Sequence, residues 1–367
     1  MVDEQIKQFG AYVNAVMTGE SLKRDVVKEL MRQVLMDEQP ELQQGALLAA
    51  LTAKGPTPEE ITGCWEAIYE FDTTKVKPHT GPLIENCGTG MDSLNTFNIS
   101  TAAAIIAAGC GCHIARHGAR ALTSSCGTVD VAQALGVDVE CSAQTVKQSI
   151  DTVGLGLFNG MSPMVHQLLA RVLSQIRFGT ILNISASLAN PASPTIGVRG
   201  VYSRDVLMLV AQVMRNIGYE KGMVFWGTNG NGSKGMDEVS NLGATCVVEF
   251  NGGGFRQYTL YPESFGIERA NETDLLSSGD VEQDAITLLR VISGEEGPRL
   301  DAACLNAAPV LYLSGAASSI EQGFELARDA VVEGRALHKL EQWVDAQNEH
   351  PEEGKRRLRA LEQKIST

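Results

Sequence analysis

The sequence predicts an α/β fold in which a small α-helical domain precedes a large α/β domain with a central mixed sheet flanked by helices. From Glu4 to about Tyr69, apolar residues recur at helical spacing. After Pro82, short apolar runs alternate with glycine-rich turns and longer helical stretches, which is typical of an α/β architecture. A chain of 367 residues can bury a large core, and its length suits two domains.

Local signals divide the helical start into separate helices. One predicted helix carries apolar residues at helical spacing, namely Leu22, Val26, Val27 and Leu30. The compact apolar helix 44–51 stops at Gly55-Pro56, because glycine favours a helix C-terminus and proline cannot continue the helix. Thr57 then begins the next helix, with Pro58 at its first position and acidic residues in its first turn.

The remaining elements follow from the alternation of apolar runs and turns. Strands are predicted at Leu83–Cys87, Cys112–Ala115, Gly222–Trp226 and Thr245–Phe250, and helices at Ala102–Ala108 and Val129–Leu135. A last helical block extends from Leu305 to about Asn348, and the charged segment 349–367 is predicted to be a loose helix or tail. We therefore divide the chain into residues 1–75 (helical, with a returning helical segment at about 163–178), 76–345 (α/β) and 346–367 (charged tail).

Composition indicates a cytoplasmic protein without a nucleic-acid or membrane partner. Lys and Arg total 30 against 44 Asp and Glu, a net charge of −14 that argues against binding nucleic acid. The chain has no run of eighteen apolar residues, and its N-terminus does not have the pattern of a signal peptide. Eight unevenly spaced cysteines indicate reduced thiols, and the close pair Cys110 and Cys112 is expected to be buried rather than metal-binding.

The segment Gly88–Thr101 carries the strongest functional signal. Its glycine-rich turn lets the backbone approach a ligand closely and point N–H groups at an anion. Asp92 adds a carboxylate for a sugar hydroxyl or a cation. The cluster Asn98–Thr101 then opens an alanine-rich helix, where hydroxyls and free N–H groups suit a phosphate.

Three further polar clusters point to the same ligand class. Arg116–Arg120 follows an apolar strand and supplies two guanidinium groups, which suit phosphate. Thr123–Thr128 places hydroxyls before a helix, and Asp237-Glu238 offers adjacent carboxylates suited to Mg²⁺. Each cluster alone is also compatible with an ordinary turn, helix cap or solvated helix start, but together they favour an anionic ligand.

The order of these motifs resembles the anthranilate phosphoribosyltransferase family over nearly the whole chain. Gln44–Gly63 is similar to the family's helical signature, and Gly88–Thr101 to its Gly-Thr-Gly-Gly-Asp…Thr-x-Asn-x-Ser-Thr motif. Arg116–Arg120 resembles Lys-His-Gly-Asn-Arg, and Asn183–Pro191 corresponds to Asn-Leu-Leu-Gly-Pro-Leu-Thr-Asn-Pro. Asp237-Glu238 matches the family's metal-binding pair.

This resemblance implies transfer of a phosphoribosyl group from 5-phosphoribosyl-1-pyrophosphate to the amine of anthranilate, with Mg²⁺ and release of pyrophosphate, in tryptophan biosynthesis. It implies a homodimer formed through the helical segment. Ser100, Asp237 and Glu238 would hold the two Mg²⁺ ions. No catalytic residue is assigned. The phosphoribosyl donor would be held by Gly88, Met91, Asp92, Thr96, Asn98, Ser100, Thr101, Arg116, His117, Gly118, Arg120, Ser124 and Thr128. The acceptor positions are Gly88, His117, Ala119, Arg171 and Leu173.

Departures from the family pattern concentrate on the acceptor side. Ala119 stands where the family has an anthranilate-contacting Asn, and the family's anthranilate-binding Arg falls on Leu173, with Arg171 and Arg177 nearby as substitutes. A pocket that loses polar contacts to a carboxylate binds it poorly. On the donor side, Met91 and Ser93 replace glycines and Arg116 replaces a lysine.

Two alternatives to the anthranilate reaction therefore stay open. One is a phosphoribosyltransferase, or a nucleoside phosphorylase, that acts on a different aromatic or heterocyclic acceptor. The other is a non-enzymatic relative that binds nucleic acid or a partner protein. The retention of Asp92, Ser100, Asp237 and Glu238 argues against this second alternative.

Overall fold

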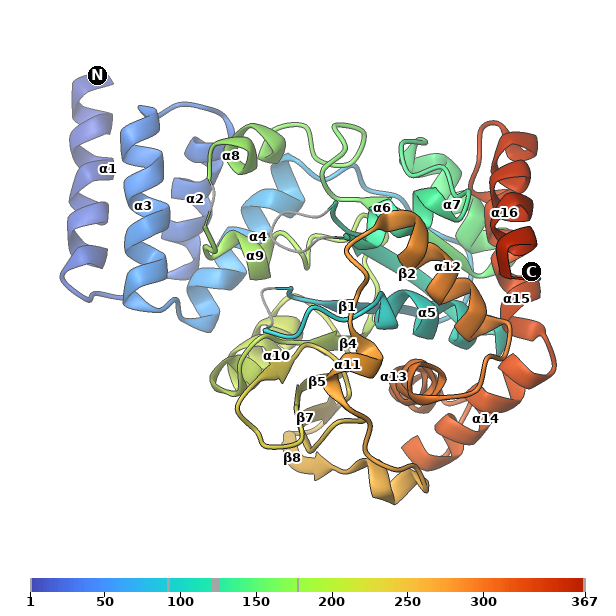
Figure 1. Ribbon diagram of the computed structural model, residues 1–367. Helices are drawn as coiled ribbons and strands as arrows, with labels where there is room; N and C mark the ends of the chain where they lie inside the picture. Colours follow the sequence, from blue (N-terminus) through green and yellow to red (C-terminus); the bar gives the residue numbers. More distant parts are fainter. Residues whose placement is uncertain (1, 91–92, 121–125, 177, 366–367) are drawn as a thin grey trace.

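Four helices form a bundle at one end of the molecule (Figure 1). The computed structural model describes residues 2–90, 93–120, 126–176 and 178–365. The bundle consists of α1 (Val2–Met17), α2 (Arg24–Leu35), α3 (Glu41–Lys54) and α4 (Pro58–Phe71). Its shared core includes Phe9, Met31, Leu47 and Ile61, each at most 1% exposed. The predicted helical start is therefore confirmed.

The predicted break between α3 and α4 is also confirmed. Gly55 ends α3 with φ +84°, a conformation that suits glycine. Thr57 begins α4 in a capping box: Thr57 Oγ1 accepts from Glu60 N (3.2 Å), and Thr57 N donates to Glu60 Oε2 (2.7 Å). Glu60 is fully buried and also pairs with Lys54 at 2.8 Å, which ties the end of α3 to the start of α4.

Two short helices return to the bundle from the middle of the chain. They are α8 (Leu169–Gln175) and α9 (Leu182–Ser185), and their apolar residues join the core of the bundle. Asp72, just after α4, accepts from the backbone N of Leu168 (2.6 Å) and Leu169 (2.8 Å). This carboxylate therefore anchors the start of α8 beside the end of α4.

A mixed sheet forms the centre of the second region. In the described residues its strands follow the order β3-β2-β1-β4-β5-β7-β8, with β6 paired to β5. The strands are β1 (Leu83–Gly88), β2 (His113–Gly118), β3 (Leu155–Asn159), β4 (Ile196–Gly200), β5 (Lys221–Thr228), β6 (Gly235–Met236), β7 (Thr245–Asn251) and β8 (Phe255–Leu260). Neighbours from β3 to β5 pair in parallel, whereas β6, β7 and β8 pair antiparallel. The four predicted strands correspond to β1, β2, β5 and β7.

Helices cover both faces of this sheet. On one face lie α5 (Ile99–Gly109) and α13 (Pro298–Ser314), whose alanine-rich surfaces pack closely together. On the other face, α10 (Leu207–Asn216) packs against β5 and β7 and continues into the core of the bundle. The remaining helices are α6 (Thr128–Ala134), α7 (Ala143–Val153), η1 (Arg204–Val206), η2 (Pro262–Phe265), α11 (Glu272–Leu275), α12 (Val281–Ile292), α14 (Ile320–Val332) and α15 (Arg335–Ala346).

The charged C-terminal segment does not form a loose tail. Residues Pro351–Ile365 form α16, which packs against α12 and α15. Leu358 and Leu361 are 4% and 5% exposed, so one apolar stripe is buried while the charged residues face outward. The prediction from sequence missed this apolar stripe because the segment is rich in charged residues.

Two composition-based expectations can be compared with the structure. All eight cysteines are free thiols, with Cys112 buried and Cys110 half-buried. Within the described residues, no helix has the length and apolar character needed to cross a membrane.

Candidate functional site

The segment Asp237-Glu238 lies across the carboxyl ends of three neighbouring strands. Glycines make this approach possible: a Cβ at Gly88, at the end of β1, would lie 2.0 Å from Asp237 Oδ2. A Cβ at Gly200, at the end of β4, would lie 1.6 Å from the Asp237 backbone oxygen. A Cβ at Gly227 in β5 would lie 2.4 Å from the Glu238 backbone oxygen. Carboxyl ends of parallel strands are the usual ligand-binding edge of such sheets.

Hydrogen bonds fix the two carboxylates in place. Asp237 Oδ2 accepts from Gly90 N at 2.8 Å, and Glu238 Oε1 accepts from Ser100 N at 3.1 Å. The next residue, Val239, is held at both its N–H and its carbonyl by the side chain of Asn306 (2.8 and 2.9 Å). Burial raises the pKa of Asp237, while the Gly90 N–H opposes that rise.

A small pocket opens beside these carboxylates. Its polar lining includes Asn86, Ser100, Asp237 and Glu238. The structure therefore brings together the three residues predicted to bind metal, from segments far apart in the sequence. Asn86 is 3% exposed, and its Oδ1 has no hydrogen-bond partner.

The donor atoms of this pocket suit Mg²⁺. Two carboxylates, a hydroxyl and an amide oxygen are hard oxygen ligands. No group of three or more His, Cys, Asp or Glu side chains arranged for a metal occurs in the part of the chain that the structure describes. A set of one or two carboxylates, completed by water and substrate phosphate, is the usual environment of Mg²⁺.

The N-terminus of α5 differs from the expected phosphate site. Asn98 occupies the N-cap position without a side-chain cap hydrogen bond. The first N–H groups are not free, because Ser100 N donates to Glu238 and Thr101 N donates to the Asn98 carbonyl (3.1 Å). Thr101 is fully buried. This helix end therefore holds a carboxylate of the protein.

Arg116 links β2 to β1 and to the start of α5 by hydrogen bonds. The residue is 1% exposed, and its Nη2 and Nη1 donate to Ser100 Oγ (2.8 Å) and Thr101 Oγ1 (2.6 Å). Its Nε donates to the Asn86 carbonyl at 3.2 Å. Burial lowers the pKa of Arg116. The guanidinium thus positions the start of α5, and its contact with a phosphate stays a prediction.

Arg120 is likewise paired within the protein. Its guanidinium donates to Asp130 (2.9 Å), Gln133 (2.9 Å) and Glu140 (2.7 Å), and these contacts raise its pKa. Gly118, at the end of β2, lies against Thr128 at the start of α6: a Cβ at Gly118 would lie 3.1 Å from Thr128 Cγ2. Gly118 and Thr128 are therefore neighbours, whereas Arg120 is directed to carboxylates.

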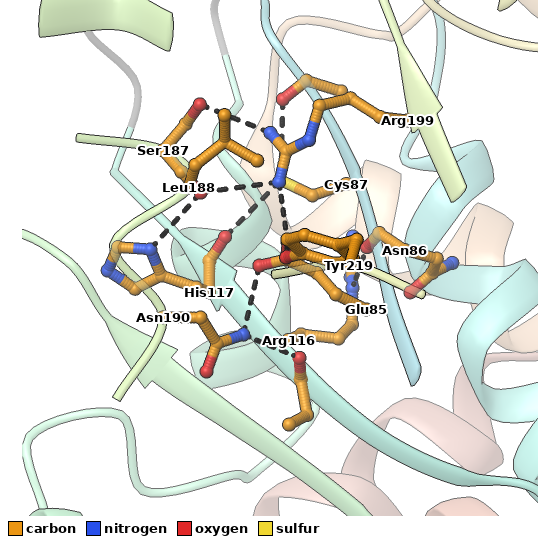
Figure 2. A network of polar contacts seen from close by, with 12 residues as sticks. Glu85, Asn86, Cys87, Arg116, His117, Ser187, Leu188, Asn190, Arg199 and Tyr219 are labelled. Atoms are coloured by element: carbon orange, nitrogen blue, oxygen red, sulfur yellow. Dashed lines mark hydrogen bonds and ion pairs between the residues drawn. The ribbon is translucent and has the colours of Figure 1, made fainter. Parts of the chain in front are cut away.

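A buried ion pair lies beneath the same strand ends (Figure 2). Glu85 on β1 and Arg199 on β4 are each 1% exposed, and Arg199 Nη2 lies 2.6 Å from Glu85 Oε2. Tyr219 donates its hydroxyl to Glu85 Oε2 (2.6 Å), and Asn190 Nδ2 donates to Glu85 Oε1 (2.9 Å). Burial opposes the charge on Arg199, but the Glu85 carboxylate outweighs it and raises the Arg199 pKa. This network has a partner for every charged group.

His117 extends the network toward the helical bundle. Its Nδ1 lies 3.4 Å from the Ser187 carbonyl, and its Nε2 lies 3.2 Å from His166 Nε2. Because a carbonyl only accepts, His117 Nδ1 carries the proton, and His166 Nε2 then donates to His117 Nε2. The remaining nitrogen, His166 Nδ1, faces Thr73 Oγ1 at 3.5 Å. Burial lowers the pKa of both imidazoles, and Asp72 Oδ2 lies 3.8 Å from His166 Nδ1.

This arrangement changes the expectation for the acceptor side. Both ring nitrogens of His117 are occupied by protein atoms, and the residue is buried. Arg171 is directed into the bundle, where it contacts Asp37 (3.2 Å), Gln44 (3.1 Å) and the Val34 carbonyl. The bundle therefore already supplies acceptors for Arg171, and its role in place of the missing arginine stays a prediction. Leu173 packs on the core of the bundle, and Ala119 is exposed after β2.

Some predicted site residues cannot be placed. Met91, Asp92 and Ser124 lie outside the described residues, as does Arg177. Thr96 forms a β-bridge with Leu276, which holds the segment that precedes α5.

Sequence reasoning missed Glu85, Asn86, His166 and Arg199. The first two belong to the run Leu83–Cys87, which was interpreted only as an apolar strand. Two polar residues inside such a run are a usable signal, because buried polar groups need partners.

Comparison with known proteins adds to this geometry. Residues 80–337 match the family model described as "Glycosyl transferase family, a/b domain", and residues 11–71 match its "helical bundle domain". An anthranilate phosphoribosyltransferase of Acetivibrio thermocellus is 35% identical over 339 residues, which cover 92% of this chain and 96% of the relative. The enzyme of the same name from Haloferax volcanii is 35% identical, with 89% and 97% covered.

Solved structures agree over the same span. The anthranilate phosphoribosyltransferase of Thermus thermophilus is 33% identical, with a TM-score of 0.82 over 91% of this chain and 98% of that chain. The Saccharomyces cerevisiae enzyme, solved in complex with 5-phosphoribosyl-1-pyrophosphate and Mg, is 24% identical with a TM-score of 0.80. Its coverage is 93% of this chain and 98% of that chain, and at this identity the likeness concerns the fold alone.

Proposed function

The chain belongs to the anthranilate phosphoribosyltransferase family of glycosyltransferases, and on that premise we propose that it transfers the phosphoribosyl group of 5-phosphoribosyl-1-pyrophosphate to the amine of anthranilate, a step of tryptophan biosynthesis. The observation that carries this proposal is the meeting of Gly88–Gly90, Ser100 and Asp237-Glu238 at the carboxyl ends of the parallel strands. Relatives named anthranilate phosphoribosyltransferase match 92% of this chain in sequence and 91% in structure.

The proposed reaction requires the protein mainly to position the two substrates and to stabilise the charge that develops on the leaving pyrophosphate. The amine nitrogen forms a bond to C1 of the ribose while the bond from C1 to the pyrophosphate oxygen breaks, and the nitrogen then loses its proton to the released pyrophosphate or to solvent. An aromatic amine is already nucleophilic, so a strong general base is not required. This agrees with a site in which both ring nitrogens of His117 already contact protein atoms.

Mg²⁺ would be held by Asp237, Glu238 and Ser100. When bound, the ion neutralises the charge that develops on the leaving pyrophosphate. The protein's part is to keep the two carboxylates at the sheet edge: Gly90 N fixes Asp237, Ser100 N fixes Glu238, and Asn306 fixes the segment that follows. Gly88 and Gly200 leave the space in which this segment lies.

A second candidate function is the same transfer to a different aromatic or heterocyclic acceptor. One observation favours it: the acceptor positions offer no free cationic group among the described residues, since Arg171 is paired in the bundle and Leu173 and Ala119 are apolar. A carboxylate such as that of anthranilate binds best in a pocket that contains a cation or hydrogen-bond donors.

Pyrophosphate release separates these possibilities. The purified enzyme is incubated with 5-phosphoribosyl-1-pyrophosphate, Mg²⁺ and either anthranilate or one of a panel of other aromatic amines and heterocycles. We expect release with anthranilate, and none in the Asp237→Ala variant. Release only with another acceptor would favour the second candidate, and no release with any acceptor would contradict both.

We also propose that the enzyme is a homodimer formed through the helical bundle. In support, α3 exposes 90% of Leu42, and Met17 at the end of α1 is 72% exposed. A second copy that docked on these side chains would remove their apolar surface from water. Light scattering after size exclusion would measure the mass, and replacing Leu42 with Glu should produce monomers.

A further inference from the structure

We propose that the side-chain oxygen of Asn86 is a ligand of the divalent cation held by Asp237 and Glu238. This inference rests on the proposed function, because it concerns the same site, but it assigns a residue that the motifs did not indicate. Asn86 lies on β1 directly after Glu85, the acidic member of the buried ion pair. It lines the pocket together with Ser100, Asp237 and Glu238.

The first step is that this oxygen is buried and unpaired. Asn86 is 3% exposed, and its Oδ1 accepts no hydrogen bond. Buried polar atoms nearly always have a partner, because an unsatisfied one has lost its hydration without compensation. A bound group is the simplest source of that missing partner.

The second step is that the Asn86 amide cannot flip to exchange the positions of Oδ1 and Nδ2. Asn86 Nδ2 donates to the Ser100 carbonyl at 2.8 Å. A carbonyl only accepts, so the nitrogen must face Ser100 and the oxygen must take the other position. The Asn86 backbone is fixed as well, because its carbonyl accepts from Arg116 Nε.

The third step is the charge of the surroundings. The neighbouring carboxylates of Asp237 and Glu238 are acceptors when ionised, and Ser100 Oγ already accepts from Arg116. The other amide in the lining, that of Asn306, gives its hydrogens to the Val239 and Ala302 carbonyls. The pocket therefore contains two carboxylates, which only accept when ionised, and such a lining attracts a cation and repels a phosphate oxygen.

Two substitutions separate the oxygen from the nitrogen of this side chain. Asn86→Asp keeps the oxygen ligand and removes the donor to Ser100. Asn86→Leu removes both at similar volume. A purely structural role through Nδ2 would make the two variants equally defective, whereas a ligand role would affect only Asn86→Leu.

The test is Mn²⁺ binding, measured by electron paramagnetic resonance in the presence of inorganic pyrophosphate, with Asp237→Asn as the reference for a damaged site. We expect Asn86→Leu to raise the Mn²⁺ dissociation constant about tenfold. Asn86→Asp should bind Mn²⁺ at least as tightly as the wild type, since it adds negative charge. If Asn86→Leu does not fold, Mn²⁺ binding is compared between Asn86→Asp and the wild type. Weaker binding in Asn86→Asp then overturns the inference.

Two results would overturn the inference. They are wild-type Mn²⁺ affinity in Asn86→Leu and a loss in Asn86→Asp equal to that in Asn86→Leu. Where the first comes with lost binding of 5-phosphoribosyl-1-pyrophosphate, the oxygen would be assigned to a sugar hydroxyl. Because the readout is cation binding, failure of the proposed transfer reaction would be seen separately, as intact Mn²⁺ binding without pyrophosphate release.

Discussion

Two polar clusters lie beneath the same strand ends, and they differ in how completely they are paired. In the ion-pair cluster, Glu85 and Arg199 are buried and satisfied by each other, Tyr219 and Asn190. In the pocket cluster, Asp237 is partly exposed and Asn86 Oδ1 has no partner among the described residues. The difference separates buried polar groups that the fold has paired from a buried polar oxygen that it has left without a partner there, although both look alike in the sequence.

The largest expected effect is on stability, from the ion-pair cluster. Arg199→Met leaves the Glu85 carboxylate buried without its cation, so we expect the free energy of unfolding to fall by about 3–5 kcal/mol. Urea unfolding followed by tryptophan fluorescence measures it. Arg256→Met is the matched control: Arg256 pairs with Glu249, but its side chain is 70% exposed, so the loss should stay below about 1 kcal/mol. Similar losses in both variants would contradict the comparison.

The next effect is on activity, from the pocket cluster. In Gly200→Ala the new Cβ would lie 1.6 Å from the Asp237 backbone oxygen, so the carboxylate segment must move. A displacement of about 1 Å at a reacting site lowers turnover on the order of 100-fold, which an assay of pyrophosphate release would detect. Gly254→Ala, where no atom lies within 4 Å, should leave turnover unchanged. Normal turnover in Gly200→Ala would mean that the position of Asp237 is unimportant.

The smallest effect concerns pH and the buried imidazole pair. Burial lowers the pKa of His117 and His166 below the ordinary value of 6.5, so the unfolded chain takes up protons below about pH 6.5 that the folded chain does not. The free energy of unfolding should therefore fall as the pH falls from 6.5 toward 5, by at most about 1.4 kcal/mol per pH unit for each histidine. His166→Gln should flatten this dependence in urea unfolding. His338→Gln, at an exposed position, is the control, and equal slopes in both variants would refute the assignment.

The elements with strong local signals could be predicted from the sequence. The break at Gly55, the start of α4 at Pro58 and strands such as β5 have local causes, namely a cap, a proline or an apolar run. In contrast, β4 escaped prediction because its sequence Ile-Gly-Val-Arg-Gly lacks a strand pattern. The strand β4 is stabilised by pairing with β1 and β5 and by the contact of Arg199 with Glu85. These partners are distant from β4 in the sequence.

The candidate site divides in the same way. The grouping of Gly88, Ser100, Asp237 and Glu238 followed from motifs, and the structure brings these residues together. The roles of the arginines could not be read locally. Arg120 and Arg171 suit a phosphate or a carboxylate by chemistry alone, but their partners Glu140 and Asp37 reach them only through the fold. The sequence pattern identified the groups that a ligand needs without showing which the protein itself had already paired.

The most direct test of the account is the Mg²⁺ dependence of donor binding, because the account assigns the pocket cluster to a cation and a phosphoribosyl donor. Calorimetry would measure the affinity for 5-phosphoribosyl-1-pyrophosphate with Mg²⁺ and with a chelator, in the wild type and in Asp237→Asn. We predict that Mg²⁺ tightens binding to the wild type and that Asp237→Asn loses this gain, about 10- to 100-fold. Equal affinity with and without Mg²⁺ in the wild type, or an unchanged gain in Asp237→Asn, would contradict the account.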